Sequence, residues 1–177
     1  MSEPKPAAPA QLFMSLFARK EEVINAAEER LKALLGPVEW QSPLLPFDQT
    51  DYYTPEFGTH LVRRFIFFER LISQESIVPI KHLAWKIEKE FSQDERRLVN
   101  IDPGYILLER LVLVTFKNFA HRLYLGQGVY GEVTMIFRHG RFQPLPWTYP
   151  DYAAAEEKWG LFSQAREKYR RKLRHVS

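Results

Sequence analysis

Several short stretches of the chain combine carboxylate, imidazole and basic side chains at spacings that suit chemistry. In the segment 47–53, Asp48 and Asp51 lie three residues apart with a threonine between them. Two carboxylates at this spacing can hold Mg²⁺ or act as a general base. Asp48 and Asp51 are therefore candidates for both the metal site and the catalytic site. The alternative is a loop stabilised by hydrogen bonds from Asp side chains to the backbone.

A second polar group lies in the segment 99–105, which is predicted to be a strand ending in a turn. Residues 102–104 (Asp-Pro-Gly) have the composition of a tight turn. Asn100 and Asp102 would then project from the tip of the strand, and with Tyr105 they are candidate ligand-binding residues. The alternative is a turn whose Asp side chain bonds only to its own backbone.

A third group brings Lys117, His121 and Arg122, three potential donors to an anion, within six residues. His121 is the best candidate for proton transfer because imidazole titrates near neutral pH. The alternative is a structural histidine with satisfied hydrogen bonds. The spacing of the five histidines does not match a histidine metal site.

The segment 143–152 alternates prolines with Trp147 and Tyr149. Two aromatic rings on a proline-stiffened segment can stack against a base or a sugar. Trp147 and Tyr149 are therefore candidate ligand-binding residues, and the alternative is a linker that packs its rings on the sheet.

The segment 126–131 (Gly-Gln-Gly-Val-Tyr-Gly) matches the glycine-rich loop of protein kinases. The downstream lysine strand, H-R-D loop and D-F-G site of a kinase are missing, and a strand-like segment follows where a dinucleotide-binding fold needs a helix. We therefore predict a hairpin turn, and the alternative is a turn that contacts a phosphate through backbone N–H groups. The chain also lacks a P-loop lysine motif and a G-x-S-x-G nucleophile elbow.

Hydrophobic periodicity and turn residues predict the elements that must position these side chains. Strands are expected at 11–18, 38–42, 60–70 and 97–101, with helices at 19–35 and 79–91. This order predicts an α+β fold with a ferredoxin-like βαββαβ start. A strand at 106–116, a hairpin at 121–137 and a strand at 141–143 would add an antiparallel meander, and a C-terminal helix would follow.

The domain organisation follows from composition. Residues 1–10 are rich in proline and alanine and are expected to be a disordered lead-in, 11–152 a single domain, and 153–177 a basic helix. The chain has no cysteine, which excludes disulfides, thiolate catalysis and iron–sulfur clusters. No apolar run is long enough for a membrane span. Without a signal-like segment, a cytoplasmic location is expected.

The positive charge is concentrated at the C-terminus. The segment 166–177 holds six basic residues and one acidic residue, whereas the chain as a whole carries only +3. Such a segment can bind nucleic acid. The alternative is a solvated helix end whose cations complement the helix dipole.

Five stretches together resemble an uncharacterised bacterial family, domain of unknown function 4416. They are GPVEWQSPLLPFDQTDYY, RRFIFFERLI, VNIDPGY, KNFAHRLYLGQGVYGEVTMIF and FQPLPWTYPDY, and they span about residues 11–152. The resemblance implies a bacterial protein but no defined chemistry. A GTP-binding role, which some family members carry as a label, is not supported, because the chain has neither a P-loop nor an N-K-x-D motif.

We therefore expect the polar loops to converge with Glu132 at one cleft that binds a small anionic or phosphorylated ligand, with Mg²⁺ as the candidate cofactor. In this hypothesis Arg64, Lys117 and Arg122 neutralise the anion, and Glu132 joins His121, Asp48 and Asp51 in catalysis. A nucleic-acid-binding module that uses residues 166–177 is one alternative. A scaffold or dimerisation domain without a ligand is the other.

Overall fold

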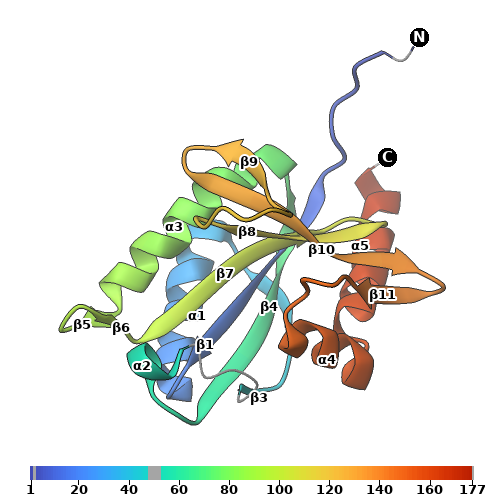
Figure 1. Ribbon diagram of the computed structural model, residues 1–177. Helices are drawn as coiled ribbons and strands as arrows, with labels where there is room; N and C mark the ends of the chain where they lie inside the picture. The colour runs from blue at the N-terminus through green and yellow to red at the C-terminus, as the bar shows by residue number, and fades with distance from the viewer. Residues whose placement is uncertain (2, 48–52, 177) are drawn as a thin grey trace.

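The computed structural model describes residues 1, 3–47 and 53–176. It shows a large antiparallel sheet with helices on both faces (Figure 1). In chain order the elements are β1 (Ala10–Ala18), α1 (Glu21–Leu35), β2 (Val38–Gln41), β3 (Leu45–Phe47), α2 (Thr54–Phe57), β4 (Leu61–Ile72), a 3-10 turn (Gln74–Ser76), α3 (Ile77–Glu90), β5 (Ser92–Gln93), β6 (Arg96–Arg97), β7 (Val99–Ile106), β8 (Arg110–Thr115), β9 (Leu123–Gly126), β10 (Val129–Arg138), β11 (Arg141–Pro144), α4 (Pro150–Trp159) and α5 (Leu161–Val176).

The chain up to β7 forms the ferredoxin-like unit that the sequence predicts. Strands β7, β1, β4 and β2 lie side by side in that order, and each neighbouring pair is antiparallel. Helices α1 and α3 pack on one face of these strands, where Ile24, Leu31 and Ile87 share a core with Met14 of β1. This arrangement is that of a split βαββαβ unit, and it confirms the α+β class with a ferredoxin-like start.

The predicted meander extends the sheet beyond β7. Strand β8 pairs with β7, β10 pairs with β8, and both β9 and β11 pair with β10. The glycine-rich segment is the turn of the β9–β10 hairpin, in which Gly126, Gln127 and Gly128 adopt positive φ angles. The Gln127 carbonyl lies 2.9 Å from Nε2 of His82 on α3. The kinase-like match is therefore a hairpin turn that contacts a helix.

The C-terminus forms two helices where the sequence predicts one. Gly160 separates α4 from α5 in the left-handed conformation, with φ of +58°. The buried carboxylate of Glu156 then accepts the backbone N–H groups of Phe162 (2.9 Å) and Ser163 (3.0 Å), which begin α5. Since Phe162 and Tyr169 are buried in the core, α5 packs as part of the domain.

The alternation of side chains along β1 divides the sheet into two faces. Met14 and Leu16 face α1 and α3, whereas Phe13, Ser15 and Phe17 face the opposite side. On that opposite side, α4 and α5 cover the part around Phe13, and aromatic residues next to α2 cover Phe17. Polar side chains occupy the region between these two apolar clusters.

The prediction of a tight turn at residues 102–104 is wrong, because the segment lies inside β7 and pairs with β1. A glycine is needed at position 104 because other atoms lie too close for a Cβ atom, and not because the backbone has a positive φ angle. A Cβ atom at Gly104 would lie 2.5 Å from the Val112 carbonyl oxygen and 2.7 Å from the Phe13 ring. Pro103 is tolerated because β7 pairs with β8 only from Gly104 onward, so no ladder bond needs its missing N–H.

Residues 3–9 lack regular secondary structure and lead away from the body of the molecule (Figure 1). In the part of the chain that the structure describes, no helix is long and apolar enough to cross a membrane.

The close approach at Gly104 predicts that Gly104→Ala destabilises the protein by about 1–3 kcal/mol, as overpacked cores do. Gly131→Ala is the matched control in β10, because its Cβ would meet only the flexible end of the exposed Leu125 side chain, at 2.9 Å. Urea unfolding of both variants measures the difference. An equal loss for the two variants would contradict this account of Gly104.

Candidate functional site

Charged side chains of α3 reach β7 at the point where β7 and β8 separate. The carboxylate of Glu88 accepts a hydrogen bond from the backbone N–H of Ile101 at 2.6 Å. This bond satisfies an N–H group on the part of the β7 edge that does not pair with β8. The ammonium of Lys81 lies 3.7 Å from the carboxylate of Asp102. The amide of Asn100 donates to the same carboxylate at 2.6 Å. Asn100 and Asp102 thus sit in a network that ties α3 to the sheet.

Arg97 extends this network to α2. Its guanidinium donates to both carboxylate oxygens of Glu56, at 2.7 and 2.8 Å, and to the side-chain oxygen of Asn100 at 2.9 Å. The hydrogen bonds from Arg97 lower the pKa of Glu56, and those to Glu56 raise the pKa of Arg97. Burial raises the pKa of Glu88, the other carboxylate that Arg97 contacts.

Glu132 of β10 is the centre of a second network on the same face of the sheet. Its side chain is 2% exposed, and its carboxylate lies 3.0 Å from Nε2 of His121 and accepts from Nε of Arg122 at 2.8 Å. The Thr134 hydroxyl donates to its other oxygen at 3.2 Å. A buried carboxylate needs such partners, so Glu132 fixes the segment that carries His121 and Arg122.

The segment that follows β11 also contacts the imidazole ring of His121. The indole N–H of Trp147 donates to the Val133 carbonyl at 2.8 Å, and its ring stacks on His121 with centroids 4.9 Å apart. The hydroxyl of Thr148 donates to the Thr134 carbonyl. Trp147 therefore positions His121 through its ring.

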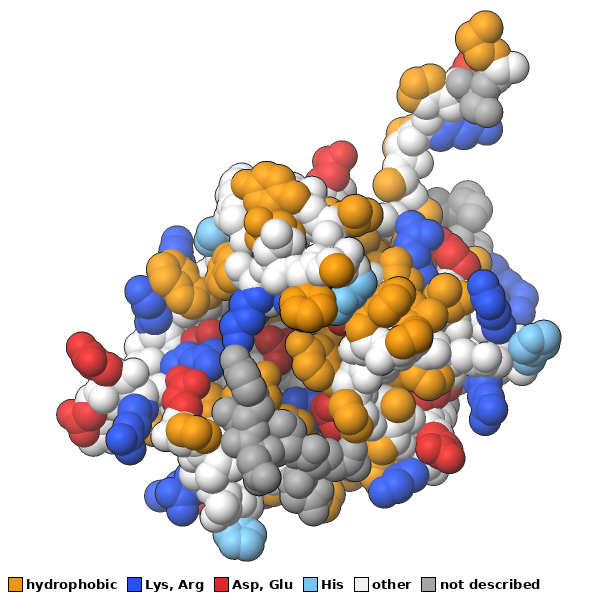
Figure 2. All heavy atoms as spheres, viewed as in Figure 1, with side chains coloured by type: hydrophobic (Ala, Val, Ile, Leu, Met, Phe, Trp, Pro, Cys, Tyr) orange, Lys and Arg blue, Asp and Glu red, His pale blue; other side chains and the backbone are white. Residues whose placement is uncertain are grey.

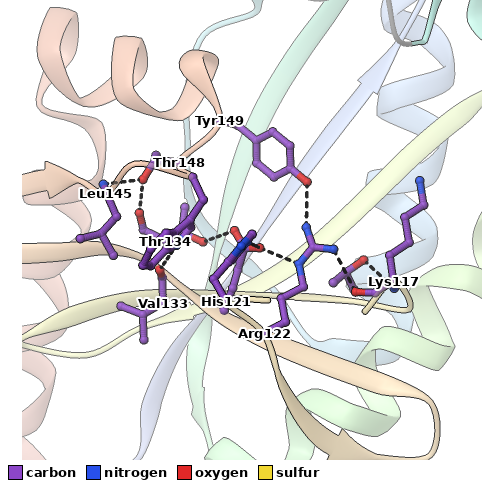
Figure 3. Close-up of polar contacts among 11 residues, drawn as sticks. Lys117, His121, Arg122, Val133, Thr134, Leu145, Thr148 and Tyr149 are labelled. Atoms are coloured by element: carbon purple, nitrogen blue, oxygen red, sulfur yellow. Dashed lines mark hydrogen bonds and ion pairs between the residues drawn. The ribbon is translucent and has the colours of Figure 1, made fainter. Parts of the chain in front are cut away.

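Arg122 connects Glu132 to Lys117 and Tyr149 (Figure 3). Its guanidinium donates to the Lys117 carbonyl at 2.9 Å and to the Tyr149 hydroxyl at 3.3 Å. Partial burial raises the pKa of Tyr149. The Lys117 side chain is exposed beside this group.

The two networks are neighbours. Burial is the main cause of the raised pKa of Tyr149, and the charge of Asp102 adds to it. Hydrogen bonds from Arg97 are the main cause of the lowered pKa of Glu56, and the charge of Lys117 adds to that effect. Blue and red side chains stand side by side near α2 in Figure 2. We call the following residues the polar cluster: Asn100, Asp102, Lys117, His121, Arg122, Glu132 and Tyr149.

The structure separates two predicted site residues from this cluster. Arg64 pairs with Leu16 across β1 and β4, so it lies on the opposite face, where it contacts Asn25, Glu21 and Glu28 of α1. Tyr105 lies on that same opposite face and packs in the core with α1 and α3. Arg64 and Tyr105 lie on the face covered by α1 and α3, because successive side chains of a strand point alternately to the two faces of the sheet. Asp48 and Asp51 lie outside the described residues.

Sequence reasoning missed Arg63, which occupies the face predicted for Arg64. Its side chain is 5% exposed, forms an ion pair with Asp151 of α4 and lies 3.9 Å from the centroid of the Phe47 ring. Burial lowers the pKa of Arg63, and the nearby Asp102 partly opposes that effect. The alternation of Arg63 and Arg64 in β4 indicates that the two point to opposite faces, but it does not say which one faces the helices.

The prediction of Mg²⁺ at Asp48 and Asp51 stays a prediction. Within residues 1, 3–47 and 53–176, no group of three histidine, aspartate or glutamate side chains could hold a metal ion.

The comparisons with known proteins identify one family. The family described as "Domain of unknown function (DUF4416)" matches residues 8–169 of the chain. No curated protein and no solved structure matches it.

The central place of Glu132 predicts that Glu132→Gln destabilises the protein by about 3 kcal/mol, because it leaves Arg122 without its buried counter-charge. Glu109→Gln is the control, since the carboxylate of Glu109 also pairs with an arginine but its side chain is 60% exposed. Chemical unfolding should show a loss below about 1 kcal/mol for this control. Similar losses for both variants would show that Glu132 is not the centre of the network.

The lowered pKa of Glu56 predicts a pH-dependent contribution to stability. A carboxylate whose pKa is lower in the folded state stabilises the fold above its unfolded pKa, and this stabilisation is lost as the pH falls. The difference in Tm between the wild type and Glu56→Gln should therefore be constant near pH 7 and shrink below the ordinary glutamate pKa of 4.5. A difference that grows on acidification would contradict the assigned ion pair with Arg97.

Proposed function

We propose that this chain, which belongs to the DUF4416 family, binds a small anionic, phosphorylated ligand at the polar cluster. The proposal rests on the convergence of polar side chains from distant parts of the chain. Hydrogen bonds of Arg122 join β10, the segment before β9 and the segment after β11, and the charge of Asp102, on β7 of the same sheet face, acts on Tyr149. Polar side chains brought together from distant segments are typical of a binding site.

The donors at the cluster suit an oxyanion. Arg122 donates to the Tyr149 hydroxyl and to the backbone carbonyl of Lys117, and Lys117 carries an exposed ammonium group on the same segment (Figure 3). Three of the five N–H groups of Arg122 are used by Glu132, Lys117 and Tyr149. A phosphate offers several acceptor oxygens and draws strength from cationic donors. We therefore assign anion binding to Lys117, Arg122 and Tyr149.

The His121–Glu132 pair gives this site the groups for proton transfer. A carboxylate fixes the orientation of the imidazole through Nε2, and the stacked Trp147 ring holds its plane. Such an oriented imidazole is the common general acid or base of enzymes. Turnover of the bound ligand would therefore depend on His121.

The basic C-terminal helix is a weaker candidate for function. Arg166 donates to the Leu108 carbonyl at 2.6 Å and stacks on Phe137, and Lys172 donates to the Glu69 carbonyl at 2.7 Å. Arg170 pairs with Glu167. Arg166 and Lys172 are thus used in contacts within the domain, whereas Lys168, Arg170, Arg171 and Arg174 are exposed. A nucleic-acid module would therefore depend on these four residues.

The scaffold alternative rests on a different observation. The segment around β9 exposes apolar side chains, with Phe119 64%, Leu123 76% and Tyr124 62% exposed. An exposed apolar group next to an edge strand can mediate association. This alternative predicts self-association and no response to phosphorylated ligands.

Thermal unfolding against nucleotides, phosphosugars and amino-acid phosphates, with and without Mg²⁺, tests the proposal. A ligand at 100 times its Kd should stabilise the protein by about 2.7 kcal/mol, which raises Tm measurably. Lys117→Met and Tyr149→Phe should reduce that shift, because each removes one donor from the anion.

Lys86→Met on α3 and Tyr124→Phe on β9 are the matched controls, and both should keep the full shift. A panel without any shift, or a shift that Lys117→Met and Tyr149→Phe leave intact, would contradict anion binding at this site. Dependence of the shift on Mg²⁺ would support the metal prediction, and its absence would count against it.

A further inference from the structure

A pocket of about 250 Å³ lies beside α4, and none of the polar-cluster residues lines it. Its lining comes from β3, β4 and α4. The apolar part of the lining consists of Leu45, Pro46, Phe47, Phe65, Ala154 and Trp159. The charged part consists of Arg63, Asp151 and Lys158. The lining therefore combines an apolar wall with three charged side chains, and such a combination can hold a small molecule.

Arg63 contributes a buried donor to this pocket. The residue is 4% exposed, and its guanidinium lies against the Phe47 ring and forms an ion pair with Asp151. Its Nε–H group has no hydrogen-bond acceptor among the described residues. A buried N–H without an acceptor is costly, so Arg63 retains hydrogen-bonding capacity that the described residues do not satisfy.

The charges of the lining select the kind of ligand. Arg63 and Lys158 carry two positive charges, and Asp151 supplies one negative charge. One additional negative charge makes the pocket neutral. A carboxylate group carries one negative charge and matches the planar geometry of a guanidinium.

The volume limits the size of the ligand. A volume of about 250 Å³ lies below the range of sites for drug-sized ligands and so favours a smaller molecule. An aryl or cyclic carboxylate with one ring is of this size. Rings of this kind pack well against aromatic walls such as Phe47 and Trp159.

We propose that this pocket is a binding site for a small apolar carboxylate, whose charged group is held by Arg63 and Lys158 and whose ring packs against Phe47 and Trp159. This inference goes beyond the phosphorylated ligand proposed above, because the two sites share none of their binding residues. Each can therefore fail without the other.

Binding of benzoate and its neutral analogue benzamide to the full chain, measured by ligand-observed NMR, tests this site. Benzoate should bind saturably, and benzamide at least tenfold more weakly, because it lacks the negative charge. Lys158→Met keeps the length of the side chain and removes its charge, so it should weaken benzoate binding about fivefold. Lys86→Met should have no effect.

A second pair of variants tests the location. Ala154→Leu places extra volume in the pocket and should abolish benzoate binding, whereas Ala153→Leu, on the neighbouring residue that does not line the pocket, should leave it unchanged. Thermal unfolding without ligand verifies that both variants fold. The inference is overturned if benzoate does not saturate, if benzamide binds equally well, or if Ala154→Leu binds benzoate like the wild type.

Discussion

The requirement to neutralise the buried carboxylate of Glu132 organises the polar side of this protein. A charge that is 2% exposed is stable only with strong hydrogen-bond partners. Those partners, His121 and Arg122, come from the segment between β8 and β9, which must fold back over β10 to reach it. Arg122 then fixes Tyr149. One buried charge thus determines the placement of two segments that follow different strands.

A comparable constraint acts where β7 and β8 separate. A strand edge without a partner leaves backbone N–H groups to be satisfied. Glu88 of α3 supplies the acceptor for Ile101, and Pro103 has no N–H to satisfy. The separation of the strands also lets Lys81 of α3 approach Asp102. The core helix α3 is thereby connected to the polar cluster, so the site is attached to rigid elements on both sides of the sheet.

The order of strands and helices could be predicted from the sequence because hydrophobic periodicity reports local structure, and the ferredoxin-like start followed from that order. The polar segments were also recognised from residue type. What the sequence could not supply was the choice of face: Arg63 and Arg64 are adjacent, and only the packing of α1 decides that Arg64 faces it. Gly104 illustrates the same limit. The sequence Asp102-Pro103-Gly104 is typical of a turn. A glycine is needed at position 104, however, because Val112 and Phe13, which are distant in the sequence, approach it closely.

The most direct test of the central claim, that the polar cluster binds an anion, is a titration of the ¹⁵N-labelled chain with pyrophosphate, followed by the shifts of its backbone amide signals. The account predicts saturable shifts concentrated in residues 117–122 and 100–102 and around Tyr149, and Lys117→Met should weaken this binding. Shifts confined to the basic helix α5, or the absence of saturable shifts, would contradict it.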